Sequence, residues 1–124
     1  MTAFNDFGLD PRIMEAIEKL GFETPSPIPV ASIPILMEGN EVIGRAQTGS
    51  GKTAAFGLPL IEKVKDGGKH VRALVLAPTR ELAIQVSEAI QVFAKGIPIN
   101  IVTIYGGSPY GPQLKALRRG VSIV

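Results

Sequence analysis

The chain has 124 residues, of which 45% are hydrophobic and 19% charged, and it contains no cysteine. This composition is typical of one globular domain with a buried core, and it excludes a disordered chain, disulfide bonds and thiolate metal sites. The net charge of +2 is too small to indicate nucleic-acid binding by itself, and no apolar run reaches the about 18 residues of a membrane span.

The first predicted element is a helix that starts at Pro11 and ends before Gly21. Asp10 is a residue type that caps a helix N-terminus, and proline suits the first helical position because the N–H it lacks would be unpaired there. Glycine commonly closes a helix because it adopts a left-handed backbone without strain. Apolar residues at helical spacing predict the buried face, which comprises Ile13, Met14, Ile17 and Leu20.

Prolines dominate the next segment, with three of them in residues 22–29. Because each proline disfavours helix in the residue before it, we expect these residues to run extended. A helix over residues 30–38 is predicted to follow, with a kink at Pro34 and an end at Gly39.

The most informative stretch runs from Ala46 to Thr53, with the sequence AQTGSGKT. Residues 41–45 predict a strand before it, and a helix to about Lys65 is predicted after it. Strand, glycine turn and helix together are the setting of a P-loop, whose backbone N–H groups and helix dipole bind phosphate oxygens. Lys52 would reach the outer phosphates, and the Thr53 hydroxyl would help to hold Mg²⁺. The alternative is a Gly/Ser/Thr loop with an exposed lysine.

The rest of the chain alternates strands with helices. A continuous apolar run predicts a parallel strand covered on both faces at residues 73–77, and further strands are predicted at residues 99–104 and 121–124. Thr79 is expected to cap a helix, and a short helix is predicted over residues 112–119. The buried stripe of the helix after Thr79 is expected to comprise Leu82, Val86, Ile90 and Phe93. This alternation predicts an α/β fold with a mainly parallel sheet flanked by helices.

Three segments in this order go beyond a general P-loop: GFETPSPI at residues 21–28, AQTGSGKT at 46–53 and PTRELA at 78–83. Together they resemble the opening motifs of a DEAD-box RNA helicase. Phe4, seventeen residues before Gly21, is similar to the isolated upstream aromatic of that family. The remaining matches are Gly106, Gly107 and Gln113. The resemblance covers nearly the whole chain and implies an incomplete N-terminal RecA-like ATP-binding domain over residues 1–124.

The resemblance implies a nucleotide site that takes ATP and Mg²⁺. Phe4 would lie against the adenine, with the backbone from Phe22 to Pro25 on the adenine edge; a core position for Phe4 is an equal alternative. The phosphate-binding residues would be Gln47, Thr48, Gly49, Ser50, Gly51, Lys52 and Thr53. Of these, Lys52 and Thr53 would serve catalysis, and Thr53 would contact the metal ion.

The resemblance also implies an RNA site formed by two segments. The residues that face the sugar-phosphate track would be Pro78, Thr79, Arg80, Gly106 and Gly107. Structural alternatives exist: the first two end a strand and cap a helix, Arg80 pairs with a nearby carboxylate, and the two glycines form a sharp turn. Backbone contacts imply little sequence preference, and 2′-hydroxyl contacts would favour RNA.

One position departs from the family pattern. Pro29 stands where the family has a glutamine. A glutamine amide donates and accepts at once and so reads the adenine edge, whereas proline does neither and lacks even the backbone N–H. The change costs little in structure because proline suits a first helical turn. We therefore expect a tolerated fold and a lost preference for adenine.

The second departure is length. The chain stops at Val124, before any Asp-Glu-Ala-Asp segment or second RecA-like domain of the family. Phosphoryl transfer needs Mg²⁺, water and positive charge placed around the γ-phosphate. We therefore expect negligible ATP hydrolysis and no duplex unwinding from this chain alone.

The sheet is expected to suffer as well. In the family's fold, strands that come later in the sequence lie between the predicted strand 41–45 and the one at 73–77. An unpaired apolar strand invites pairing with another chain. We therefore expect either a rearranged sheet or a homodimer in which strands such as 121–124 are exchanged or paired between copies.

The leading interpretation is part of a DEAD-box ATP-dependent RNA helicase, which hydrolyses ATP as the full-length protein. The first residues lack a signal-peptide pattern, and we expect a cytoplasmic protein that does not enter a membrane. One alternative is a nucleotide-binding module without turnover, and another is a chain that only self-associates. Nucleotide affinity separates the self-associating chain from the helicase and the binding module. Hydrolysis separates the helicase from both alternatives.

Overall fold

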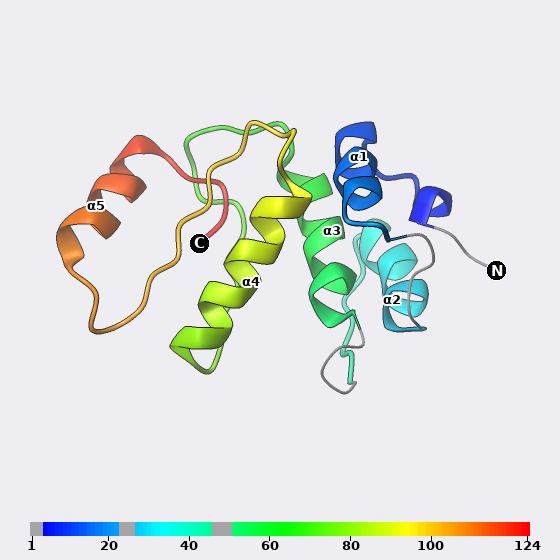
Figure 1. The fold of residues 1–124 in the computed structure, drawn as a ribbon, viewed down its shortest axis with the longest axis horizontal. Helices are drawn as coiled ribbons and strands as arrows, with labels where there is room; N and C mark the ends of the chain where they lie inside the picture. The colour runs from blue at the N-terminus through cyan, green and yellow to red at the C-terminus, as the bar shows by residue number, and fades with distance from the viewer. Residues whose placement is uncertain (1–3, 23–26, 46–50) are drawn as a thin grey trace.

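The computed structural model describes residues 4–22, 27–45 and 51–124, and its described part is mainly helical (Figure 1). The elements in chain order are a 3₁₀ turn η1 (Phe4–Phe7) and the helices α1 (Pro11–Lys19), α2 (Pro27–Met37), α3 (Lys52–Val64), α4 (Arg80–Phe93) and α5 (Tyr110–Arg119). Within the described ranges, every helix is too short or too polar to cross a membrane. Figure 1 shows α1 to α4 grouped together, with α5 beyond the extended segments that follow α3 and α4.

Helix α1 forms where its end signals predict it. The Asp10 carboxylate accepts a hydrogen bond from the Arg12 backbone amide at 2.9 Å, and Pro11 occupies the first helical position. Gly21 follows the helix with a left-handed φ of 76°, which glycine adopts without strain. Ile13 and Ile17 are buried as predicted, and Met14 is half-buried. Leu20 was predicted on the buried face, which is wrong, because the helix ends before it and leaves it exposed.

Helix α2 begins earlier than the prolines predict. It starts at Pro27, so the expectation of extended backbone is wrong for residues 27–29. The physical reason is that the first N–H groups of a helix have no partner within it, so prolines at the first and third positions cost no hydrogen bond. Pro34 lies inside the helix as predicted. Residues 23–26 lie outside the described part of the chain.

Helices α3 and α4 confirm their predicted positions. Helix α3 contains Pro59 and ends within a residue of the predicted Lys65. Thr79 caps α4, since its hydroxyl accepts a hydrogen bond from the Leu82 amide at 3.1 Å. Of the stripe predicted for α4, Ile90 and Phe93 are buried, Val86 is half-buried and Leu82 is exposed. Helix α5 starts two residues before the predicted 112.

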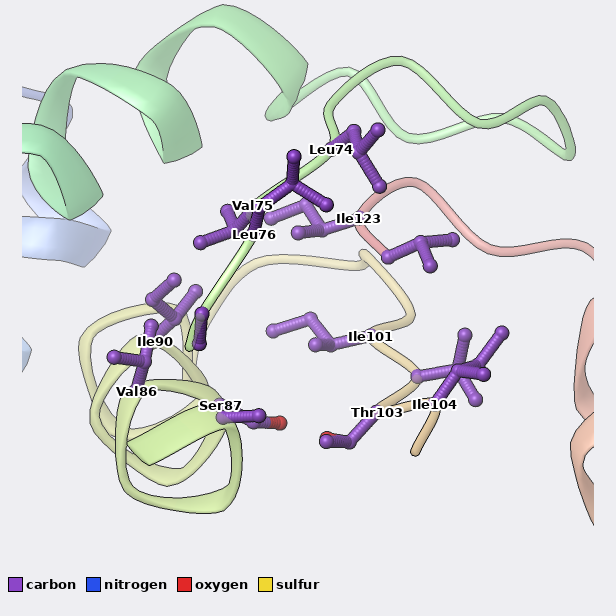
Figure 2. Close-up of a pocket in the computed structure, with 14 residues that line it drawn as sticks. Leu74, Val75, Leu76, Val86, Ser87, Ile90, Ile101, Thr103, Ile104 and Ile123 are labelled. Atoms are coloured by element: carbon purple, nitrogen blue, oxygen red, sulfur yellow. The ribbon is translucent and has the colours of Figure 1, made fainter. Parts of the chain in front are cut away.

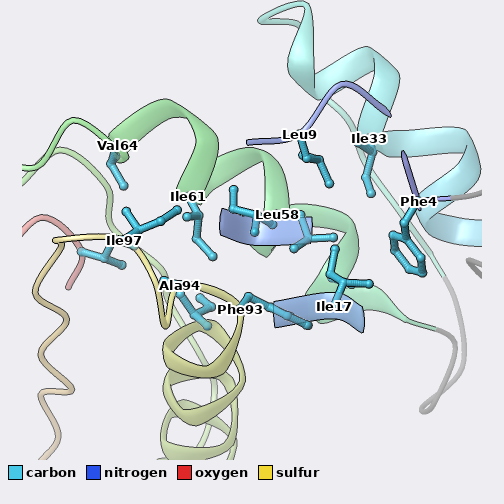
Figure 3. Packing of buried hydrophobic residues seen from close by; sticks show 14 residues of the cluster. Phe4, Leu9, Ile17, Ile33, Leu58, Ile61, Val64, Phe93, Ala94 and Ile97 are labelled. Atoms are coloured by element: carbon cyan, nitrogen blue, oxygen red, sulfur yellow. The ribbon is translucent and has the colours of Figure 1, made fainter. Parts of the chain in front are cut away.

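The hydrophobic core lies between α1, α2, α3 and α4. Helix α3 packs against α2 and α4, and α1 packs against α4. In Figure 3, Leu58 of α3 lies among Leu9, Ile17 and Phe93, which come from three other parts of the chain. The buried cluster comprises Phe4, Leu9, Ile13, Ile17, Ile33, Ala54, Leu58, Ile61, Val64, Ile90, Phe93, Ala94, Ile97 and Ile123. Helix α3 is therefore packed against the core from its first turn to its last.

The predicted sheet is not confirmed. In the described residues, two isolated parallel bridges join Ile123 to Ala73 on one side and to Ile101 on the other. The Val124 amide donates to the Ala73 carbonyl at 3.0 Å, and the Val102 amide donates to the Ile123 carbonyl at 3.1 Å. The segments 73–77, 99–104 and 121–124 thus have the predicted parallel direction but lack the length of pairing that defines strands.

The first predicted strand is also absent, because residues 41–45 form no strand and no bridge with other described residues. Ile43 is fully exposed, and Leu74 and Leu76 in the next apolar segment are 66% and 85% exposed. Side chains of this kind are normally buried when parallel strands have neighbours on both sides. The physical reason for the correction is therefore the lack of pairing partners within the described residues.

Residues 121–124 pair inside the chain, between 73–75 and 100–102. Among the described residues, the segment 41–45 pairs with no other segment, and 73–77 and 99–104 each pair on one side only, with 121–124. Any strand pairing between copies would thus use one of these three segments rather than 121–124.

Candidate functional site

The start of α3 carries the described part of the predicted phosphate site. Gly51 is the N-cap residue with φ 85° and ψ 21°, a left-handed backbone that only glycine adopts readily. Lys52 and Thr53 follow as the first two helical residues, the first exposed and the second half-buried. The other predicted phosphate-binding residues lie outside the described part of the chain: Gln47, Thr48, Gly49 and Ser50.

This helix start has the chemistry of an anion site. No side chain of the described residues caps the first turn of α3, and the backbone N–H groups and positive dipole end of a helix N-terminus attract anions. Lys52 adds a positive charge at the same end. In the described residues, no group of three or more His, Cys, Asp or Glu side chains could hold a metal ion. The Thr53 hydroxyl fits a Mg²⁺ ion that takes its remaining ligands from phosphates and water, as this ion usually does.

The predicted adenine-side aromatics form a ring cluster. Phe4 and Phe22 are stacked with ring centroids 6.2 Å apart, and Phe7 meets Phe4 edge-on at 6.0 Å. Phe22 also contacts Phe93 of α4, at 6.5 Å. Phe4 is only 5% exposed and belongs to the core, which is the structural alternative for this residue. Its adenine contact, like that of Pro25 outside the described residues, stays a prediction.

Pro29 lies near the start of α2, the helix that follows Phe22 in the sequence. It is the third residue of α2 and is fully buried. The first-turn position predicted to tolerate proline is therefore the one observed. No polar side chain can be offered to a ligand from this position as long as it is proline.

The two predicted RNA-facing segments come together in the structure. Arg80, the first residue of α4, donates from Nη2 to the Gly106 carbonyl at 3.2 Å, across 26 residues of sequence. Its guanidinium also lies over the Tyr105 ring, 5.5 Å from the centroid. The partner of Arg80 in the described residues is thus a turn, not the predicted alternative of a carboxylate. Pro78 and Thr79 are exposed immediately before it.

The turn itself requires glycine. Gly107 has φ 81°, and a Cβ at this position would lie 2.9 Å from the Arg80 Nη2 atom. A side chain here would be strained by the backbone and would push the guanidinium away. The close approach of Arg80 to the turn therefore depends on Gly107.

Sequence reasoning noted Gln113 as a family match but assigned it no role. In the structure Gln113 lies in α5, and its Nε2 atom donates a hydrogen bond to the Tyr105 carbonyl at 3.3 Å. Tyr105, which contacts both Arg80 and Gln113, was not predicted at all. The sequence signal that could have pointed to Gln113 was a polar residue near the start of the helix that follows the Gly106–Gly107 turn.

A charged cluster joins the far end of α3 to α1. Glu62 accepts from the Asp10 amide and pairs with Lys65, while Asp10 pairs with Arg12 at 3.0 Å and with Lys65 at 3.6 Å. The Arg12 side chain, followed by its backbone amide, holds the pKa of Asp10 well below its usual range. The bond to Asp10 raises the pKa of Arg12, and the bond to Glu62 raises that of Lys65. This cluster fixes the C-terminal end of α3 against the start of α1, at the opposite end of α3 from Lys52.

An apolar cavity of about 270 Å³ lies between α4 and the extended segments. Figure 2 shows Val86, Ser87 and Ile90 of α4 on one side and Ile101 and Ile123 on the other. Its lining contains no charged side chain. The cavity therefore has the character of incomplete packing between helix and segments and not of a phosphate site.

A left-handed glycine followed by Lys-Thr at the start of a helix is the arrangement in which a P-loop ends. The comparison with known families agrees and is more specific, because the model of the DEAD/DEAH box helicase family matches residues 26–124. The chain belongs to this family.

Several bacterial proteins named as ATP-dependent RNA helicases are similar in sequence to the chain. The chain is 55% identical over 122 residues to the ATP-dependent RNA helicase DeaD of Haemophilus influenzae and 53% identical over 124 residues to that of Escherichia coli. It is 46% identical to the ATP-dependent RNA helicase CshA of Listeria monocytogenes. These matches take in 98–100% of the chain but only 20–24% of the relatives. The chain thus spans about a fifth to a quarter of the curated relatives it matches.

Solved structures resemble the chain over the same extent. A crystal structure of a DEAD box protein from Methanococcus jannaschii has a TM-score of 0.91 and 40% identity, and covers 100% of this chain and 34% of that one. The RNA helicase Prp28 of Chaetomium thermophilum, bound to ADP, has a TM-score of 0.90 and 39% identity, with 99% and 31% covered. The helices and extended segments are therefore arranged as in these two structures.

Proposed function

We propose that the chain is the N-terminal part of the first RecA-like domain of an ATP-dependent RNA helicase, and that it contacts nucleotide phosphates and the RNA backbone. The observation that carries this proposal is the start of α3, where Lys52 and Thr53 follow the left-handed Gly51. Family membership and the ADP bound by the similar Prp28 structure support it.

The nucleotide would be ATP with Mg²⁺, which supplies the transferable phosphoryl group. The residues of this chain would hold and orient it. The amides at the start of α3 would bind phosphate oxygens, Lys52 would neutralise their charge, and the Thr53 hydroxyl would meet the metal ion. The residues from Gln47 to Ser50 would complete the cradle, and Phe4, Phe22 and Pro25 would border the adenine.

The RNA surface would be formed by Pro78, Thr79, Arg80, Gly106 and Gly107. The contact of Arg80 with Gly106 supports this, because it joins the two segments into one exposed surface. Contacts with phosphates and sugars would give little sequence preference. Such binding suits an enzyme that acts on RNA of many sequences, in the cytoplasm.

Hydrolysis and unwinding would belong to a longer protein. The chain spans only a fifth to a quarter of its helicase relatives, and it contains no Asp-Glu-Ala-Asp segment. In the longer protein the segments 41–45 and 73–77 would gain strand neighbours and complete a mainly parallel sheet. The chain alone would bind nucleotide without measurable turnover.

Self-association is a second candidate property, and the exposure of Leu74 and Leu76 favours it. Exposed apolar segments with free backbone groups pair readily with other chains. A homodimer would then form through residues 41–45 and 73–77. If the chain associates but binds no nucleotide, this alternative replaces the first proposal.

The test is calorimetric titration of the chain with ATP, ADP and GTP in the presence of Mg²⁺. We expect micromolar ATP binding, and a loss of about ten- to a hundredfold in Lys52→Ala, as for removal of a charge-assisted hydrogen bond. The matched control is Lys63→Ala, which removes an exposed lysine at the other end of α3. No binding by the unaltered chain, or equal loss in both variants, would contradict the proposal.

A further inference from the structure

Gln113 differs from every other residue of its helix. It is the one buried residue of α5, at 8% exposure, although none of the core cluster comes from α5. A buried amide needs hydrogen-bond partners, because an unpaired polar group away from water is costly. Gln113 meets this need by donating to the Tyr105 carbonyl. Its burial therefore serves the turn rather than the core.

The turn from Tyr105 to Gly107 is held at two successive carbonyl groups. Gln113 binds the Tyr105 carbonyl at 3.3 Å, and Arg80 binds the Gly106 carbonyl at 3.2 Å. The Tyr105 ring under the Arg80 guanidinium adds a cation–π contact. Helices α4 and α5 thus hold the same turn from two sides.

The held carbonyl groups determine where the amides point. Both peptide bonds of the turn are trans, and in a planar trans peptide the C=O and the following N–H point in opposite directions. The Gly106 amide therefore points away from Gln113, and the Gly107 amide points away from Arg80. Both glycines are exposed, and neither amide donates a hydrogen bond to another described residue. Two successive free amides of this kind suit a phosphate oxygen.

We propose that Gln113 is a positioning residue, which by binding the Tyr105 carbonyl aims the Gly106 amide, and with Arg80 the Gly107 amide, at a nucleic-acid phosphate. This inference rests on the proposed RNA-binding function of the turn. It assigns to α5 a part in RNA binding although Gln113 itself touches no RNA. Gln113 would contribute by orienting the turn amides, since its own side chain carries no charge.

The test compares Gln113→Met with the unaltered chain. Methionine keeps the length of the side chain and the helix propensity but removes the donor, and the core is left intact because α5 does not contribute to it. We expect the Gly106 and Gly107 amide signals to shift and their hydrogen exchange to accelerate in nuclear magnetic resonance. We also expect the affinity for a short labelled oligouridylate to fall about three- to tenfold, as for one lost hydrogen bond.

Salt dependence separates orientation from charge. Because Gln113→Met removes no positive charge, the slope of log affinity against log salt should stay unchanged while the affinity falls. The control is Lys115→Gln, an exposed cation on the same helix, which should leave the turn amides unchanged. Gln113→Glu provides a second variant, since an ionised carboxylate of nearly the same shape cannot donate. It should shift the turn amides as Gln113→Met does, while its added negative charge lowers the RNA affinity further.

The two proposals fail in different ways. If the Gly106 and Gly107 signals of both Gln113 variants overlay those of the unaltered chain, the inference about Gln113 is wrong whatever the RNA affinity. If the turn amides respond but the unaltered chain binds no oligouridylate at any salt concentration, the positioning role stands and the proposed RNA contact at this turn is wrong.

Discussion

The backbone amide of Asp10 donates to the Glu62 Oε2 atom at 2.9 Å, and this bond joins the start of α1 to the end of α3 across 52 residues. The same Asp10 carboxylate caps α1 and accepts from the Arg12 side chain. Its side chain is only 12% exposed. One residue therefore begins α1 and fixes its position on α3, the helix that starts at Lys52.

The first prediction concerns this cap. Asp10→Ala should lower the free energy of unfolding by about 1 kcal/mol, because a helix N-cap is lost and Arg12 and Lys65 lose a partner. Urea denaturation followed by circular dichroism measures the change. The control is Glu15→Ala, which removes an exposed ion pair with Lys19 at 3.1 Å and should cost about 0.5 kcal/mol or less. Equal losses in the two variants would show that the cap has no special weight.

The second prediction concerns pH. The pKa of Asp10 is lowered in the folded chain, so the unfolded state takes up the proton first as the pH falls. The stabilisation by Asp10 should be complete above its unfolded pKa of about 3.9 and should fade as the pH drops toward the lowered folded value. Urea midpoints measured at several pH values should fall less steeply below about pH 4 in Asp10→Asn, which keeps a capping side chain without the charge. Parallel curves would contradict the assignment.

The third prediction concerns the Gly106–Gly107 turn. Gly107→Ala should destabilise the chain by about 1 kcal/mol, because alanine is strained at positive φ. Since the new Cβ would also displace Arg80, we expect weaker oligouridylate binding. The matched control is Gly111→Ala, because Gly111 lies in α5 with no atom near the added Cβ. That substitution should be neutral or stabilising. Denaturation and fluorescence anisotropy give the two readouts, and unchanged RNA affinity in Gly107→Ala would contradict the role of the turn.

The fourth prediction concerns base recognition. Pro29→Gln should raise the preference for ATP over GTP, because it restores an amide that can both donate and accept at the position where the family has glutamine. Calorimetric titration with both nucleotides measures the ratio. Pro27→Gln is the control, since Pro27 is exposed in the same helical turn, and it should leave the ratio unchanged. A strong ATP preference already present with Pro29 would disprove the hypothesis.

The fifth prediction concerns association. Leu76→Lys should shift the chain toward the monomer, because a lysine in an open, exposed segment opposes edge-to-edge pairing. Sedimentation velocity over a range of concentrations measures this. Val92→Lys adds the same charge at a partly exposed position of α4 and should not change the association. If the unaltered chain is monomeric at every concentration, the proposed self-association is wrong.

Most helix positions, including the start of α3 at Lys52, were predictable because they depend on residues close in sequence. The Asp10–Pro11 start, the Gly21 end, the Thr79 cap and the Lys52–Thr53 helix start all arise from contacts within one helical turn. The motif pattern likewise led to the family that the comparison shows. The early start of α2 escaped prediction because two prolines fall within its first turn, where they cost no hydrogen bond.

Only the tertiary structure decided which distant groups meet and which apolar segments lack a neighbour. The contact of Arg80 with Gly106, the support of Tyr105 by Gln113 and the core position of Phe4 all join residues whose spacing carries no local signal. The sequence pattern predicted four strands, yet the described residues form only two isolated parallel bridges, which join Ile123 to Ala73 and to Ile101. The physical reason is that a helix satisfies its own backbone, whereas a strand forms only where another segment supplies the hydrogen bonds.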